Sequence, residues 1–161
     1  MNEAHLHMVV NHFPIIGSIF GLGILLISLI FKNKAVQNVA YGLFILSAIF
    51  GAISMATGEG AEEIAEKLPS VTHQIIHEHE EMAEKLAILL YALGAFSILG
   101  AYLDFKKHPI SKFVTYVVLI ISIGTVFFAT QTGTTGGEIR HTEIRTDAAL
   151  STPVSDEEHE D

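Results

Sequence analysis

Four apolar segments determine what this chain can fold into. They run over residues from about 13 to 31, 36 to 56, 86 to 103 and 113 to 129. Each has about 17 to 21 residues, close to the ~20 that a helix needs to cross a hydrocarbon core of ~30 Å. A helix satisfies its backbone hydrogen bonds internally, as the bilayer requires. None of the four carries the polar stripe of a soluble amphipathic helix. The pattern predicts an all-α, polytopic membrane protein built as a four-helix bundle.

Two of the helices are predicted to continue beyond their apolar parts. A Pro-Ser pair at 69–70 is typical of a helix start with Ser70 as N-cap, so the third helix should run over 70–103 and project from the membrane. The fourth helix should run over 113–135. The N-terminus lacks the basic stretch of a cleaved signal peptide, so we expect the first segment to be retained as an anchor.

Domain organisation and composition exclude several classes of protein. We expect one transmembrane domain over residues 1–149 and a disordered acidic tail over 150–161. The chain has no cysteine, which excludes disulfides, thiolate metal sites and thioether-attached haem. Its net charge is −9, and it has no basic face of the kind that binds nucleic acid.

The lysines predict the orientation in the membrane. Lys32 and Lys34 lie in the first loop, and Lys106, Lys107 and Lys112 lie in or beside the third. By the positive-inside rule these two loops face the cytoplasm. Both termini and the acidic second loop then face outward. The expected location is a bacterial inner membrane, with N- and C-termini in the periplasm and the lipid bilayer as the first partner.

Seven of the nine histidines fall at this outer end of the predicted bundle. They are His5, His7, His12, His73, His77, His79 and His141. Histidine is the commonest metal ligand and titrates near neutral pH. Ionisable residues at a membrane edge are costly and usually functional. The cluster therefore predicts a metal, haem or proton site.

The approach to the third apolar segment has two alternative inner faces. His73, His77 and Glu81 follow each other at intervals of four, so they share one face of a helix and can chelate zinc, iron or manganese. His79 lies about 160–200° around the helix from His77, because each residue turns ~100°. The sequence leaves open which face is internal, with a slight preference for His77.

Two short motifs carry a family resemblance. Residues 7–15 read HMVVNHFPI and residues 136–141 read GGEIRH. They resemble the opening and closing runs of an uncharacterised bacterial four-helix membrane family, the domain of unknown function twenty-two thirty-one. The proline that usually follows the first histidine is absent here. The family has no firm activity, but its helices and histidines resemble membrane b-type cytochromes, in which two histidines from different helices hold the haem.

The first functional hypothesis is electron transfer through haem b near the periplasmic face. Its expected cofactor-binding residues are His7, His12, His77, His141 and Arg140. Either His12 with His77 or His7 with His141 would ligate the iron, and Arg140 would contact a haem propionate. The redox partner would be a quinone or a periplasmic redox protein.

Two alternatives remain open from the sequence. A zinc, iron or copper ion would be held by His12, His73, His77, Glu81 and His141. Alternatively, the chain is a non-redox accessory or pH-sensing subunit of a larger membrane complex. The spacing of Gly17 and Gly21 would also allow a homo-oligomer through close helix contact.

Overall fold

The computed structural model describes residues 2–68 and 71–145, and these residues fold entirely into helices and connecting turns. The elements are α1 (Glu3–Val10), α2 (His12–Ile30), α3 (Lys34–Ala56), α4 (Gly58–Ala65), α5 (His73–Phe105), α6 (Ser111–Arg140) and a 3₁₀ turn, η1 (Thr142–Ile144). No strand occurs among these residues, so the predicted all-α class is confirmed. The predicted tail at 150–161 and the predicted cap Ser70 lie outside the described residues.

Four helical stretches are long and apolar enough to cross a membrane, as predicted. They are Glu3–Ile30, Lys34–Ala56, His73–Phe105 and Ser111–Arg140. The first consists of α1 and α2, which are separated at Asn11. Pro14 lies in the first turn of α2, where its missing N–H leaves no hydrogen bond unmade.

Helices α5 and α6 are longer than a bilayer requires. They have 33 and 30 residues, so at ~1.5 Å per residue they measure about 50 and 45 Å, against a hydrocarbon core of ~30 Å. Helix α5 begins at His73 after the N-cap Thr72, whose hydroxyl accepts from the Ile75 N–H at 3.4 Å. Both helices therefore extend well beyond their apolar parts.

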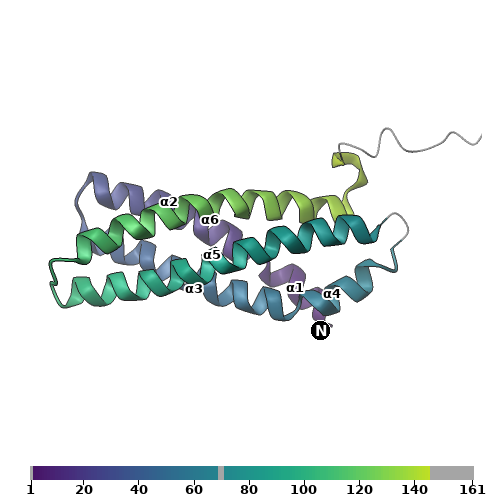
Figure 1. Cartoon of the computed structure of the whole chain (residues 1–161), viewed down its shortest axis with the longest axis horizontal. Helices are drawn as coiled ribbons and strands as arrows, with labels where there is room; N and C mark the ends of the chain where they lie inside the picture. Colours follow the sequence, from purple (N-terminus) through teal and green to yellow (C-terminus); the bar gives the residue numbers. More distant parts are fainter. Residues whose placement is uncertain (1, 69–70, 146–161) are drawn as a thin grey trace, which may run out of the picture.

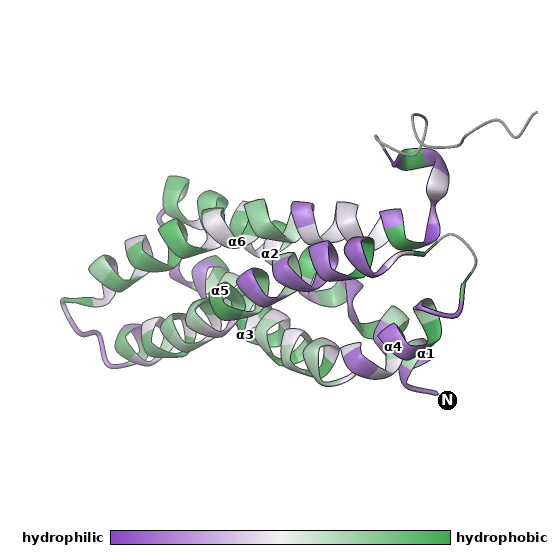
Figure 2. Cartoon of the chain, turned by 45° about the vertical axis from the view of Figure 1, so that its right-hand side comes forward, coloured by the Kyte–Doolittle hydropathy of each residue, from purple (hydrophilic) through white to green (hydrophobic). Residues whose placement is uncertain are grey.

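The four long helices pack in a closed cycle. Helix α2 packs against α3 and α6, and α5 packs against the same two helices (Figure 1). We call the end formed by α1, α4, the start of α5 and the end of α6 the histidine end. The opposite end, with the turns at 31–33 and 106–110, is the lysine end. The N-terminus and the last described residues both lie at the histidine end (Figure 1). Hydrophilic residues gather at the two ends of the assembly (Figure 2).

Large apolar side chains fill the middle of the assembly. Leu25, Tyr41, Phe44, Leu93 and Val118 are fully buried there. Small residues allow this close packing, because a Cβ atom at Gly21 would collide with the Phe44 ring. One at Gly17 would collide with the Ser47 hydroxyl. The Gly17–Gly21 face, whose spacing would also allow an oligomer contact, is thus used inside the chain against α3.

A buried hydrogen-bond network closes the lysine end. The Gln37 amide donates to Asp104 at 2.7 Å, to the Tyr41 hydroxyl at 2.8 Å and lies 3.1 Å from the Thr115 hydroxyl. Asp104 also pairs with Lys34 at 2.8 Å. The network joins α3, α5 and α6, and it gives buried polar groups the partners that burial demands.

Candidate functional site

His7 lies on α1 with its ring half-buried against the end of α3. Its Nδ1 atom is 3.0 Å from the Ser54 carbonyl oxygen and 3.3 Å from the Thr57 hydroxyl. A carbonyl only accepts hydrogen bonds, so in this geometry Nδ1 carries the proton and donates it. The lone pair of a neutral His7 ring is then on Nε2. This is how metal-binding histidines are usually held, with one nitrogen anchored and the other free to bind.

His79 lies on α5 with its ring turned toward α6. Its Nδ1 atom is 3.1 Å from the Thr135 hydroxyl, and the ring is also in reach of the Thr132 carbonyl. Gly136 lies directly against the ring, because a Cβ atom there would be only 2.9 Å from Cε1 of His79. His79 and His7 are near enough to interact electrostatically. The structure therefore places two half-buried imidazoles, from α1 and α5, at the same end of the assembly.

The inner face of α5 explains why His79 rather than His77 points inward. The buried residues Ile76, Leu86, Leu90 and Leu93 recur at helical spacing, and His79 falls on the same stripe. The slight preference for His77 was wrong: its side chain is 72% exposed and lies 3.5 Å from Glu81. The sequence signal that identifies His79 is its position seven residues before Leu86.

The other predicted ligands lie on the surface of the histidine end. Four of them are exposed, namely His12, His73, His141 and Arg140. His73 lies 3.2 Å from Glu66 of α4, and His141 lies 2.9 Å from Glu143 of η1. Neither predicted pairing, His12 with His77 or His7 with His141, appears among the contacts of these side chains.

The predicted mixed cage of His12, His73, His77, Glu81 and His141 is not formed by the described residues. No group of three or more histidine, aspartate or glutamate side chains in residues 2–68 and 71–145 is placed to hold a metal ion. Of the predicted set only His77 and Glu81 pair, and Glu81 also contacts Lys85 at 3.2 Å. The Glu81 carboxylate is therefore a solvated surface charge.

Two carboxyl groups, one on α4 and one on α5, lie close together at the histidine end. Glu62 lies close to Glu80 of α5. Partial burial, and then the hydrogen bond and charge of Glu80, raise the pKa of Glu62, while His73 opposes the shift. Glu3 of α1 lies over Gly60, so α4 is held between α1 and the start of α5. A shared proton between the two carboxyls suits this arrangement.

Two cavities lined by described residues lie away from the histidine pair. One of about 540 Å³ opens at the lysine end. The other, of about 400 Å³, is an apolar hollow between the outer sides of α3 and α5. The candidate functional groups at the histidine end are His7, His79 and the hydroxyls and carbonyls that hold them. No protein-family model, curated protein or solved structure matches this chain.

Proposed function

We propose that the chain is a four-helix bundle of the bacterial inner membrane with its histidine end in the periplasm. Five of the nine lysines and arginines lie at the lysine end: Lys32, Lys34, Lys106, Lys107 and Lys112. Short loops rich in lysine stay on the cytoplasmic side. The even number of spans then returns both termini to the outer side.

We further propose that the chain carries haem b, with His7 and His79 as its axial ligands. The observation that carries this proposal is the presence of two half-buried, hydrogen-bonded imidazoles, from α1 and α5, within electrostatic range of each other at the histidine end. A histidine from each of two helices is the ligand set of a low-spin b-type haem. His7 and His79 thus replace the pairs that we expected from the sequence.

The ligand set fits a haem better than a bare metal ion. A porphyrin supplies four of the six iron ligands and needs only one or two from the protein. A zinc ion takes three or four protein ligands. The described part of the chain offers two imidazoles here, and no carboxylate joins them.

The two motifs behind the family resemblance meet at this pair. His7 belongs to the opening run, residues 7–15, and Gly136 begins the closing run, residues 136–141. His79 interacts with the first and packs on the second. Both runs contribute residues to the same candidate site, which supports a role for them in binding the cofactor as well as in packing.

A haem at this place would supply one-electron chemistry at the outer surface. The chain itself would anchor the ligand rings through Ser54, Thr57 and Thr135. Its partner would be a quinone or a periplasmic redox protein that meets the histidine end.

The test is an absorption spectrum of the full-length protein, purified in detergent, before and after reduction. We expect the split visible bands of a low-spin haem, and metal analysis should give iron. His7→Ala and His79→Ala should each lower the haem-to-protein ratio at least ~10-fold, the usual minimum for loss of a metal ligand or its support. His77→Ala and Glu81→Gln, on the exposed face of the same helix, serve as controls and should retain haem.

Other outcomes would identify a different function. A colourless protein with stoichiometric zinc, copper or iron, lost in Glu81→Gln, would favour the mixed metal site. A colourless and metal-free protein, isolated without loss of cofactor, would favour the accessory or pH-sensing subunit. Full haem content in His79→Ala would refute the ligand assignment.

A further inference from the structure

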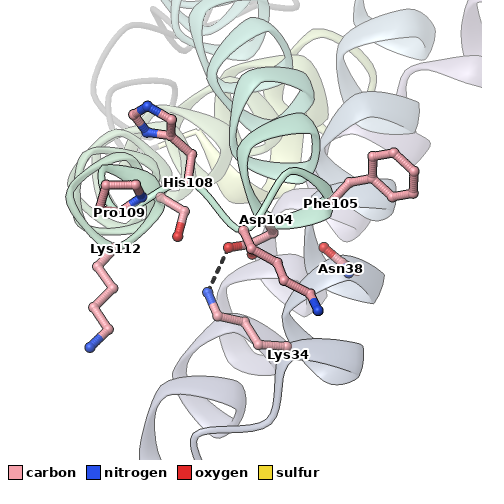
Figure 3. Close-up of a pocket in the computed structure, with 9 residues that line it drawn as sticks. Lys34, Asn38, Asp104, Phe105, His108, Pro109 and Lys112 are labelled. Carbon is pink, nitrogen blue, oxygen red and sulfur yellow. Dashed lines mark hydrogen bonds and ion pairs between the residues drawn. The ribbon is translucent and has the colours of Figure 1, made fainter.

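Among the charged residues that line the cavity at the lysine end, positive charges outnumber negative ones. It opens between the start of α3, the end of α5 and the start of α6 (Figure 3). Three lysines line it, Lys34, Lys107 and Lys112, and Asp104 is the only acid among the described residues that do so. Three positive charges against one negative leave a balance of two, before His108 is counted. This is notable in a chain with a net charge of −9.

The single carboxylate is already neutralised by the protein. Asp104 is 6% exposed and binds Lys34 at 2.8 Å and the Gln37 amide at 2.7 Å. It therefore offers little repulsion to an incoming anion. Lys107 and Lys112 are not needed for this pairing, so their charges are available to a ligand. Helix α6 also begins at the cavity, with no side chain capping its first turn, and helix N-termini favour anions.

Lys107 occupies a backbone position that normally belongs to glycine. Its φ is 53°, in the left-handed region, and the following N–H of His108 bonds back to the Leu103 carbonyl at 2.9 Å. This is the Schellman ending of a helix, in which glycine is usual. A lysine there places a cation beside the cavity at a cost in backbone conformation.

The surroundings of the cavity are those of a lipid–water boundary. Phe105 lines the cavity and is 80% exposed, and Phe31 and Phe113 are also exposed at this end. Apolar side chains of this size remain exposed without cost only against lipid. Figure 3 shows Phe105 on one side of the cavity and His108 and Lys112, at the start of α6, on the other.

We infer that this cavity binds the phosphate group of an anionic phospholipid. Basic pockets between membrane helices are suited to phospholipid head groups. The lysines would contact the phosphate, and the acyl chains would lie along the exposed phenylalanines. A free phosphate ion shares the head-group chemistry and lacks the chains, so the two ligands can be told apart.

The experiment is native mass spectrometry of the delipidated full chain in detergent. It is titrated with phosphatidylglycerol, with phosphatidylcholine and with inorganic phosphate. We expect phosphatidylglycerol to bind more tightly than phosphatidylcholine, and inorganic phosphate in excess not to displace it. Lys107→Gly should weaken binding about five-fold, which corresponds to about 1 kcal/mol per lysine near an anionic surface.

Lys32→Gly is a closely matched control. Lys32 has a φ of 50° in the equivalent turn after α2, but it does not line the cavity. Both variants put glycine where glycine is preferred, so both should fold. Equal losses in the two variants, or equal binding of the two lipids, would overturn the inference. Displacement of the lipid by inorganic phosphate would assign the cavity to a free anion instead.

Discussion

The absence of a side chain at Gly136 leaves room for the His79 ring against α6. A Cβ atom at this position would be 2.9 Å from the imidazole, and a ring cannot yield as the end of a flexible side chain does. We expect Gly136→Ala to displace the ring, shift the His79 NMR signals and lower haem content as His79→Ala does. Gly133→Ala, one turn earlier on α6, is the control, because its nearest neighbour would be Ile15 at an ordinary 3.6 Å. Identical spectra for the two variants would contradict the prediction.

Which histidines meet could be predicted only in part from the sequence. The cluster at one end follows from the apolar segments, but the choice between His77 and His79 depends on which face of α5 is buried. That face is visible in the sequence only if the stripe from Leu86 is continued outward. The network at the lysine end was not predictable, since Gln37 and Thr115 are 78 residues apart and only packing brings them together.

Contact between α2 and α3 depends on the glycine on the inner side of α2. Gly21→Ala would force a methyl group into the Phe44 ring, and overpacking of this kind costs about 1–3 kcal/mol. Gly23→Ala is the matched control, because nothing lies within 4 Å of its Cβ position. Unfolding of both variants in a denaturing detergent titration should show a loss of stability for the first alone. A loss of equal size in Gly23→Ala would contradict the prediction, because alanine favours a helix more than glycine does and no neighbour opposes it at position 23.

The attachment of α4 should depend on pH. The pKa of Glu62 is raised in the folded chain, so the folded state holds this proton more firmly than the unfolded state. The contact with Glu80 is then strongest below the raised pKa and weakens as pH increases through it. Exposed pairs of this kind are worth about 1 kcal/mol or less.

Hydrogen exchange of the α4 amides measures this attachment. Protection should be greater at acid than at neutral pH in the native chain, and Glu62→Gln should remove the difference. Glu63→Gln, at the next and exposed position, is the control and should leave it. If the protection of the α4 amides against hydrogen exchange rises with pH, the proposed proton shared by Glu62 and Glu80 is wrong.

Orientation across the membrane can be tested without a background signal, because the chain has no cysteine. Single cysteines at Glu59 and Lys106 would report the histidine end and the lysine end. In intact cells an impermeant maleimide should label Glu59→Cys, and Lys106→Cys should react only after lysis. The reverse pattern would place the histidine end in the cytoplasm.

The general fold follows from the sequence more fully than the site does. Four apolar segments of bilayer length leave few alternatives to four spanning helices, and the structure has four helices long and apolar enough to span a membrane. Helix α1 was not predicted as a separate element, because its eight residues are too few to show a clear periodicity. A short surface helix over residues 61–68 is indicated by the sequence, and the structure forms it as α4 over Gly58–Ala65. Both short helices pack against each other and against α3.

The packed middle of the assembly makes the protein chemically one-sided. Leu25, Phe44, Leu93 and Val118 are completely enclosed between the two ends. The hydroxyls nearby, such as those of Ser122 and Thr125, donate to carbonyls of their own helix and form no relay. From His79 to Gly100, which contacts Tyr41, α5 rises about 30 Å. Under the proposed function, a proton or electron taken up at the histidine end would therefore leave on the side from which it arrived, and the chain would be a terminal acceptor and donor rather than a conductor across the bilayer.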